Sequence, residues 1–210
     1  MNGHECYIIG AGDFFGLVQA PDDSDYVIAA DAGYNYCREN NIMPDLVLGD
    51  FDSLGLAPDH PNVMELPVEK DDTDMIFAVK LGLEKGYKHF FIYGGLGGDR
   101  PDHTVANLQT LLYIANRGGR GWLYGKNYVW TAINKDVLKL KGNGPVAVFT
   151  LDGKAQGVNI KGLKYELENA EISPDFPLGV SNSLENGEAE ISVENGTLLV
   201  MYNINIGETD

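Results

Sequence analysis

Along the first half of the chain, short apolar runs alternate with stretches in which apolar residues recur every three or four positions. The runs predict buried strands, and they cover residues 7–9, 26–30, 45–48, 63–68 and 90–93. The amphipathic stretches predict helices, from about residue 33 to 40, from 71 or 72 to 86, and from about 102 to 118. This alternation predicts an α/β fold with a mostly parallel sheet and helices on both faces.

The second half has a different pattern, with short apolar runs separated by turn residues. Strands are expected at residues 128–133, 137–140, 146–151, 158–160 and near 165–168. Residues 188–194 and 197–204 flank Asn195-Gly196, which favours a type I′ hairpin. We therefore expect a C-terminal all-β, sandwich-like domain over residues 125–210, after an α/β domain over residues 1–124.

Acidic residues follow four consecutive predicted strands of the first half. They are Asp31, then Asp50 and Asp52, then Asp71, Asp72 and Asp74, and finally Asp99 and Asp102. Because parallel strands end at one edge of a sheet, these side chains should converge. One acid at a helix start is an ordinary cap, but four clusters at one edge would repel each other unless a cation neutralised them.

Asp50 and Asp52 form the most distinctive of these clusters. They stand one residue apart at the end of an apolar run, with no basic residue beside them in sequence. Carboxylate pairs of this kind suit Mg²⁺, which binds one or two carboxylates together with substrate phosphates. An Asp-rich turn in which Ser53 caps the next segment is the alternative.

Glycines and two cations complete a candidate phosphate site. The loop Gly94-Gly95-Leu96-Gly97-Gly98 can bring backbone N–H groups close to phosphate oxygens. Lys70 and Arg100 either contact phosphate or form local salt bridges with Asp71 and Asp102. His103, at a helix start, is either a ligand contact or a solvated polar residue. No Walker A or complete dinucleotide-binding motif occurs.

Composition narrows the classes of partner. The formal net charge of −16 argues against a nucleic-acid surface and a basic membrane patch, although Mg²⁺ can still bridge acidic protein to a nucleotide. The two cysteines, Cys6 and Cys37, form no CxxC motif, so neither a disulfide framework nor a zinc site is expected. With no signal peptide or membrane span in the sequence, we expect a cytoplasmic protein.

These residues, taken in order, resemble the thiamine pyrophosphokinase family. The resemblance is carried by segments 30–33, 44–53, 70–74, 94–103 with Asn107, 162–167 and 179–182. It spans nearly the whole chain. The chain departs from the family pattern at Ala32, where Asp-Gly-Gly is common and this sequence has Asp31-Ala32-Gly33.

The resemblance implies a homodimer that transfers a pyrophosphoryl group from ATP to thiamine and releases AMP, with Mg²⁺ as cofactor. It implies that Asp50, Asp52 and Asp74 bind metal, and that Asp74, Asp102 and Arg100 act in catalysis. Ser181 and Asn182 would contact thiamine. The nucleotide would be held by Asp31, Lys70, Asp71, Gly94, Gly95, His103 and Asn107.

Three other functions remain open at this point. A pyrophosphokinase for another hydroxymethyl heterocycle, such as a pterin, would differ only in its acceptor pocket. A metal-dependent phosphohydrolase would use the same acids to activate water. A non-catalytic module would bind Mg²⁺ and nucleotide without forming AMP.

Overall fold

The computed structural model describes residues 4–51, 58–69 and 71–209. The chain divides into two compact units. The first comprises Met1–Thr110 with Leu123–Gly125, and the second comprises Leu111–Trp122 with Lys126–Asp210. Helix α3 and strand β6 each contribute residues to both units.

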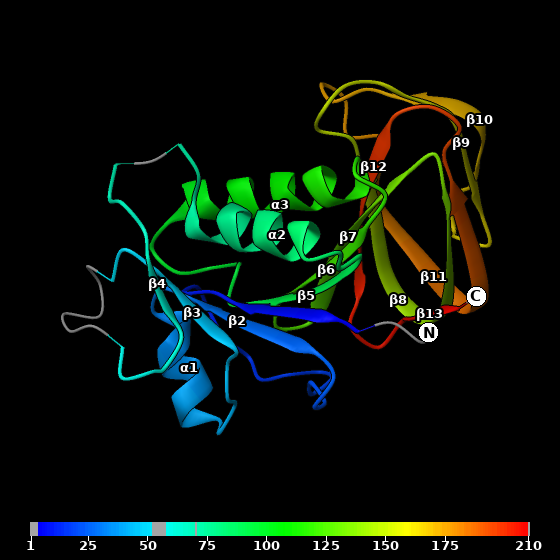
Figure 1. The fold of residues 1–210 in the computed structure, drawn as a ribbon. Helices are drawn as coiled ribbons and strands as arrows, with labels where there is room; N and C mark the ends of the chain where they lie inside the picture. The colour runs from blue at the N-terminus through cyan, green and yellow to red at the C-terminus, as the bar shows by residue number, and fades with distance from the viewer. Residues whose placement is uncertain (1–3, 52–57, 70, 210) are drawn as a thin grey trace. The chain divides into compact units, whose positions relative to one another are not determined.

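The order of helices and strands matches the predicted change from an α/β to an all-β pattern (Figure 1). The elements are β1 (Cys6–Ile9), β2 (Tyr26–Ala30), α1 (Gly33–Glu39), β3 (Leu46–Gly49), β4 (Val63–Glu65), α2 (Asp74–Glu84), β5 (His89–Tyr93), α3 (Pro101–Ala115), β6 (Arg120–Tyr124), β7 (Tyr128–Asn134), β8 (Val137–Phe149), β9 (Ala155–Lys161), β10 (Leu167–Ile172), β11 (Gly179–Ser192), β12 (Thr197–Asn203) and β13 (Gly207–Thr209).

The first unit is built on a parallel sheet with strand order β5-β1-β2-β3-β4. Strand β1 of this sheet is fully buried on both faces, and Ile8 lies opposite Ile28 and Ile92 in register. Helix α1 covers one face of the sheet and α2 covers the other (Figure 1). Burial on both faces explains why these strands are continuous apolar runs, and it confirms the predicted α/β fold.

Helix α2 begins later than the sequence pattern indicated. Its N-cap is Thr73, whose hydroxyl accepts a hydrogen bond from the backbone N–H of Ile76 at 3.3 Å. The prediction that this helix begins at residue 71 or 72 is therefore wrong. Asp72 instead forms an ion pair with Lys80, with its carboxylate 2.7 Å from the ammonium group.

We expect Thr73→Ala to lower the free energy of unfolding by about 1 kcal/mol, because the Ile76 N–H loses its capping acceptor. Urea denaturation followed by circular dichroism measures this loss. Thr73→Ser keeps the hydroxyl and serves as the control. Equal stability of the alanine and serine variants would contradict the capping role.

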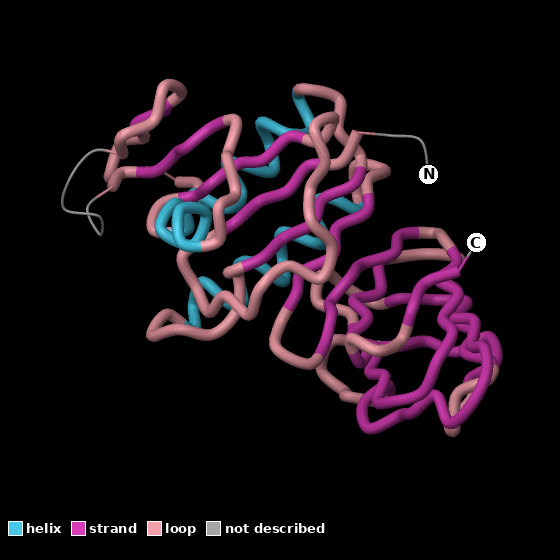
Figure 2. The backbone as a smooth tube through the Cα atoms, turned by 90° about the horizontal axis from the view of Figure 1, so that it is seen from below, coloured by secondary structure: helices cyan, strands magenta, loops and turns pink. Residues whose placement is uncertain are grey.

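The second unit is an antiparallel sheet with strand order β10-β9-β11-β8-β12-β7, and β13 pairs with β8. In Figure 2 the residues from β7 onward form only strands and connecting loops. This confirms the predicted all-β character of the second half. Among the described residues, no helix is long and apolar enough to cross a membrane.

The predicted hairpin around Asn195-Gly196 is wrong. Strands β11 and β12 do not pair with each other, because β8 lies between them and pairs with both. The loop between them is drawn instead to the start of β9, where the N–H of Gln156 donates to the carbonyl of Asn195 at 2.8 Å. Asn195-Gly196 therefore lies in the connection between β11 and β12, two strands that are not neighbours in the sheet.

Residues 137–149 form one long strand, β8, where two short strands were expected. Gly142 and Gly144 have φ values of +146° and +144°, so the strand continues through them in a conformation that L-residues rarely adopt. A Cβ on Gly144 would lie 2.8 Å from the Cβ of Asn203. The glycines therefore let the C-terminal segment pass close to a bent strand. Strand β6 was not predicted at all.

Candidate functional site

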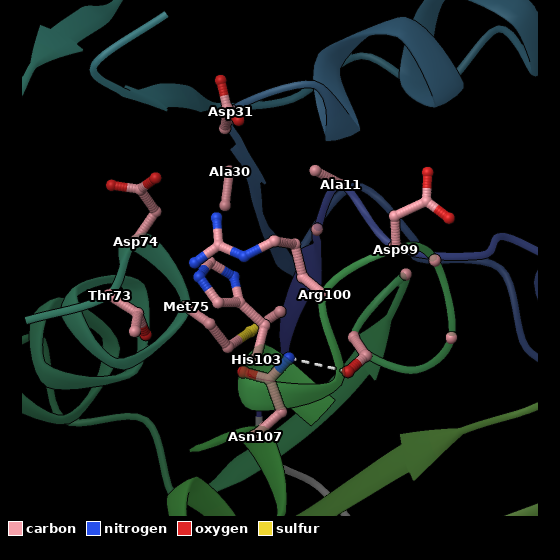
Figure 3. A pocket seen from close by; sticks show the side chains of 16 residues that line it. Ala11, Ala30, Asp31, Thr73, Asp74, Met75, Asp99, Arg100, His103 and Asn107 are labelled. Atoms are coloured by element: carbon pink, nitrogen blue, oxygen red, sulfur yellow. Dashed lines mark hydrogen bonds between the residues drawn. The ribbon is translucent and has the colours of Figure 1, made fainter. Parts of the chain in front are cut away.

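A pocket opens at the carboxyl ends of β1, β2 and β5 in the first unit (Figure 3). Ligands bind at this edge of open parallel sheets. The pocket is lined by residues from the loops that follow these strands and from the first turns of α2 and α3. They are Gly10, Ala11, Gly12, Ala30, Asp31, Thr73, Asp74, Met75, Gly94, Gly95, Gly97, Gly98, Asp99, Arg100, His103 and Asn107.

Two glycine-containing loops, after β1 and after β5, pack backbone to backbone to form the floor of this pocket. The N–H of Gly12 donates to the carbonyl of Gly94 at 2.7 Å, and the N–H of Asp13 donates to the carbonyl of Leu96 at 2.8 Å. A Cβ on Gly10 would lie 2.7 Å from the Gly94 oxygen, so neither loop has room for a side chain there. The glycines expose backbone at the pocket, as a phosphate site requires.

The buried amide of Asn107 fixes the second of these loops. Its Nδ2 donates to the carbonyl of Gly95 at 2.6 Å, and the side chain is 7% exposed. Figure 3 shows this bond at the base of the pocket. Asn107 therefore determines the loop conformation from helix α3, and its amide is directed at protein rather than at the opening.

Asp31 occupies a left-handed backbone conformation, with φ at +50°. Its N–H donates to the carbonyl of Leu48 at 2.7 Å, and Gly49 packs so closely that a Cβ there would lie 3.0 Å from the Asp31 Cα. The end of β3 thus holds Asp31 in place at the end of β2. Strain of this kind at a pocket is typical of functional positions.

The departure from the family pattern at Ala32 is accommodated without strain. Ala32 is the N-cap of α1, with φ −62° and ψ −8°, which is an ordinary right-handed conformation for alanine. The close approach occurs at the next residue, Gly33, whose backbone lies against the carbonyl of Ile9 and leaves no room for a Cβ.

Asp74 and Asp99 bring two further carboxylates to the pocket. Asp74 is the first residue of helix α2, where an acid is stabilised by the helix dipole, and its Oδ1 atom is buried. Asp99 lies in the loop before α3 and is exposed. Figure 3 shows Arg100 lying between these two acids.

Arg100 lines the pocket and also forms an ion pair with Asp102. Nε donates to Oδ1 at 3.1 Å and Nη2 donates to Oδ2 at 2.8 Å, so the pair is bidentate. The hydrogen bonds from Arg100 lower the pKa of Asp102 to about 2, and the same contact raises the pKa of Arg100. Asp102 therefore stays ionised at any ordinary assay pH and is a weak proton acceptor.

The predicted site residues fall into four groups. The pocket brings together Asp31, Asp74, Gly94, Gly95, Arg100, His103 and Asn107. Asp50, Asp71 and Asp102 belong to the same unit but do not line it. Asp52 and Lys70 lie outside the described residues. Ser181 and Asn182 belong to the second unit.

Two side chains that line the pocket, those of Thr73 and Met75, were not among the predicted site residues. Both flank Asp74. Their positions beside predicted site residues were the available signal. Met75 was assigned to the hydrophobic face of α2, and it is 6% exposed, so it is both a core and a pocket residue.

In the second unit, Asn182 is buried and its side-chain amide binds backbone. Its Nδ2 donates to the carbonyl of Tyr165 at 2.6 Å, and its Oδ1 accepts from the N–H of Tyr165 at 2.9 Å. Ser181 beside it is exposed, with φ at +61°. Asn182 thus fixes the loop that carries Tyr165, whereas the Ser181 side chain is accessible to a ligand.

The oxygen donors at the pocket suit Mg²⁺. Within the described ranges, no three His, Cys, Asp or Glu side chains are close enough together to form a complete protein site. Mg²⁺ does not need one, because it commonly binds one or two carboxylates and completes its shell with water and substrate phosphates. Asp31 and Asp74 supply carboxylates of this kind beside the Arg100 guanidinium.

The fold and the pocket together define a class of protein: an α/β unit with a pocket at the edge of its parallel sheet, followed by an antiparallel β unit. Residues 17–120 match the model of the thiamin pyrophosphokinase catalytic domain, and residues 138–198 match the model of its vitamin B1 binding domain. The chain belongs to the thiamin pyrophosphokinase family, as its sequence motifs predicted.

Individual relatives agree with this assignment. The thiamine pyrophosphokinase of Bacillus subtilis (strain 168) is 26% identical over 189 residues, which cover 86% of this chain and 88% of that protein. The crystal structure of the thiamine pyrophosphokinase from Bacillus subtilis superimposes with a TM-score of 0.82 at 25% identity, covering 95% of this chain and 99% of that one.

A second solved structure is similar in fold. The thiamin pyrophosphokinase of Geobacillus thermodenitrificans has a TM-score of 0.80 at 24% identity, with coverage of 94% of this chain and 96% of that one. At this identity the likeness supports the fold alone.

Proposed function

We propose that this protein is a thiamine diphosphokinase, which transfers the pyrophosphoryl group of ATP to the hydroxyethyl oxygen of thiamine and releases AMP. The observation that carries this proposal is a pocket that combines carboxylates, an arginine and exposed glycine backbone, in a chain that matches both domain models of the family. Such transfer requires positioning and charge neutralisation rather than a covalent nucleophile.

In this proposal the glycine loops and Arg100 hold the polyphosphate. Gly95, Gly97 and Gly98 line the pocket and carry no side chain of their own, and Arg100 adds a planar cation that matches a phosphate edge. Donors fixed before the substrate arrives stabilise the charge that develops on the transferring group.

Asp31, Asp50 and Asp74, with Asp52, are the carboxylates that would hold Mg²⁺. When bound, the ion neutralises negative charge on the polyphosphate and helps align it for in-line displacement. The donor set of carboxylate oxygens beside a cationic arginine fits this role. Asp71, His103 and Lys70 remain proposed contacts to the nucleotide.

In the proposed chemical step, one carboxylate of this chain accepts the proton that the thiamine hydroxyl releases. The thiamine hydroxyl oxygen bonds to the β-phosphorus of ATP, the bond from that phosphorus to the α-β bridging oxygen breaks, and AMP leaves with the electron pair. The hydroxyl proton passes to a carboxylate. We assign this acceptor to Asp74, because Asp74 lines the pocket and has a buried carboxylate oxygen, whereas Asp102 is exposed and does not line it.

We also propose that residues 125–210 bind thiamine, that residues 1–124 bind ATP, and that two copies of the chain form a dimer. Ser181 is exposed, and Asn182 fixes the neighbouring Tyr165 loop. The match to a vitamin B1 binding domain supports this division of roles.

Product analysis tests the proposed function. The protein is incubated with ATP, Mg²⁺ and either thiamine or a hydroxymethyl pterin, and AMP, ADP and phosphate are quantified. We expect AMP only with thiamine. AMP with the pterin alone would reassign the acceptor, phosphate without an acceptor would indicate a phosphohydrolase, and nucleotide binding without products would indicate a non-catalytic module.

Ser181→Ala should weaken thiamine binding several-fold and leave ATP binding nearly unchanged, since a hydroxyl contact to a ligand is worth about 1 kcal/mol. Serine and alanine both carry a Cβ, so they meet the same steric restriction at this positive φ and the fold should be unaffected. Isothermal titration calorimetry with each ligand makes the comparison. Equal losses for thiamine and for ATP would contradict the separate roles of the two domains.

A further inference from the structure

Arg100, which lines the pocket, forms a bidentate pair with Asp102, which does not line it. Arg100 lies just before helix α3, and its carbonyl accepts hydrogen bonds from the N–H groups of His103 at 3.1 Å and Thr104 at 3.3 Å. Its backbone is therefore fixed by the first helical turn. The guanidinium is in turn held by both carboxylate oxygens of Asp102, two residues along the chain.

Among the described residues, Asp102 occupies one edge of the guanidinium, and the other edge has the geometry to bind a ligand. An arginine side chain has five N–H donors in one plane. Asp102 takes the edge formed by Nε and Nη2. The opposite edge, formed by Nη1 and the second hydrogen of Nη2, has the fork geometry that binds two phosphate oxygens at once.

Asp102 itself is poorly placed for the chemistry. Its side chain is 63% exposed and does not line the pocket, whereas Arg100 does. Asp74 lies at the pocket with one buried carboxylate oxygen. The two acids that the sequence offered as equivalent catalytic candidates are therefore distinguished by location.

We infer that Asp102 is a positioning residue, which holds the Arg100 guanidinium so that its second edge meets a nucleotide phosphate, and which does not contact the reacting atoms. This inference rests on the proposed function only in requiring that the pocket binds a nucleotide polyphosphate. It differs from the catalytic role that the family resemblance implied for Asp102.

The direction in which Asp102→Asn changes nucleotide affinity distinguishes a positioning role for Asp102 from a purely electrostatic one. Asp102→Asn removes a negative charge near an anionic ligand, which by itself would tighten nucleotide binding. Loss of positioning would instead weaken nucleotide binding, because the ligand alone must then order the long arginine side chain. We expect the second effect to exceed the first, since both side chains are exposed and charge effects there are screened by salt.

Binding is measured by calorimetry with Mg²⁺ and α,β-methylene-ATP, which the enzyme cannot cleave at the bond in question. The variants are Asp102→Asn, Arg100→Lys and the double variant. Glu171→Gln is the control, because it breaks an exposed ion pair, with Lys154, in the other unit. Circular dichroism establishes that each variant is folded.

We expect Asp102→Asn to raise the dissociation constant roughly three- to tenfold, the cost of ordering one long side chain. In the Arg100→Lys background, which lacks the bidentate fork, the same change should not weaken binding further. Glu171→Gln should bind as the wild type does. At saturating ATP, Asp102→Asn should lower turnover in the wild-type background but should not lower it further in the Arg100→Lys background, because Asp102 acts only through Arg100.

Three results would overturn the inference. Unchanged or tighter nucleotide binding by Asp102→Asn would show that the ion pair does not orient the Arg100 guanidinium for a phosphate. An equal loss in both arginine and lysine backgrounds would show that Asp102 acts independently of Arg100. A large fall in turnover that Asp102→Asn adds to that of Arg100→Lys at saturating ATP would make Asp102 catalytic in its own right. The binding results stand even if thiamine proves not to be the acceptor, so this inference and the proposed function fail separately.

Discussion

Asp74→Asn is expected to reduce AMP formation by about a thousandfold or more while the protein stays folded. Asp74 lines the pocket, and it is both a proposed Mg²⁺ ligand and the proposed proton acceptor. Metal charge stabilisation is worth several kcal/mol, and each 1.36 kcal/mol is tenfold in rate. Asparagine is nearly isosteric with aspartate, so the start of helix α2 should be preserved.

The measurement is AMP produced at saturating ATP and thiamine, together with the melting temperature. Loss of a first-turn acid costs about 0.3–1 kcal/mol, which corresponds to a shift of no more than about 4 °C. Asp72→Asn is the matched control, because Asp72 stands two residues earlier and pairs with Lys80 rather than lining the pocket. If Asp74→Asn and Asp72→Asn had equally small effects on rate, Asp74 would have neither proposed role.

Gly94→Ala is expected to destabilise the first unit by about 2–5 kcal/mol. Gly94 has φ at +62°, which costs an L-residue about 1–2 kcal/mol. Its Cβ would also collide with the carbonyl of Gly10, and forced overpacking costs about 1–3 kcal/mol more. Because the two loops form the pocket floor together, any variant protein that folds should also bind nucleotide weakly.

Gly118→Ala separates the two contributions. Gly118 has a similar φ, +70°, but a Cβ there would meet nothing within 4 Å. It should therefore show only the conformational cost of about 1–2 kcal/mol. Denaturant unfolding of both variants gives the comparison. Equal destabilisation would mean that the close contact between the two loops contributes nothing to stability.

The inner part of the parallel sheet was predictable because β1, β2, β3 and β5 are buried on both faces. Residues such as Ile8, Ile28 and Ile92 form continuous apolar runs, and each run ends in glycine or an acid. The exact helix start was not predictable, since three aspartates and a threonine, all capable of capping, stand together at the start of α2. Only the tertiary position of the chain selects Thr73.

The strand pairing of the second unit could not be obtained from local signals. Asn195-Gly196 is a favoured hairpin turn, yet β8 lies between the strands on either side of it. Gly142 and Gly144 resemble a turn but continue a strand. In both cases the decisive contacts join residues far apart in the sequence: Asn195 contacts Gln156, and Gly144 packs against Asn203. The residues next to them in the sequence do not indicate these contacts.

The acids at the strand ends illustrate what the sequence can and cannot reveal about the site. Topology brings Asp31, Asp74 and Asp99 to one pocket, as parallel strand ends require. It does not determine side-chain direction. Asp102 turns back to Arg100, an alternative that the sequence left open, and Asn182 turns inward to backbone groups.

The central claim is that thiamine attacks the β-phosphorus of ATP, and an isotope experiment tests it most directly. Thiamine carrying ¹⁸O in its hydroxyethyl group is incubated with the wild-type protein, Mg²⁺ and unlabelled ATP, and the products are analysed by mass spectrometry. The account predicts one AMP for each thiamine diphosphate, no ADP, and full retention of ¹⁸O in thiamine diphosphate. Formation of ADP with thiamine monophosphate, or of phosphate or pyrophosphate with unmodified labelled thiamine, would contradict it.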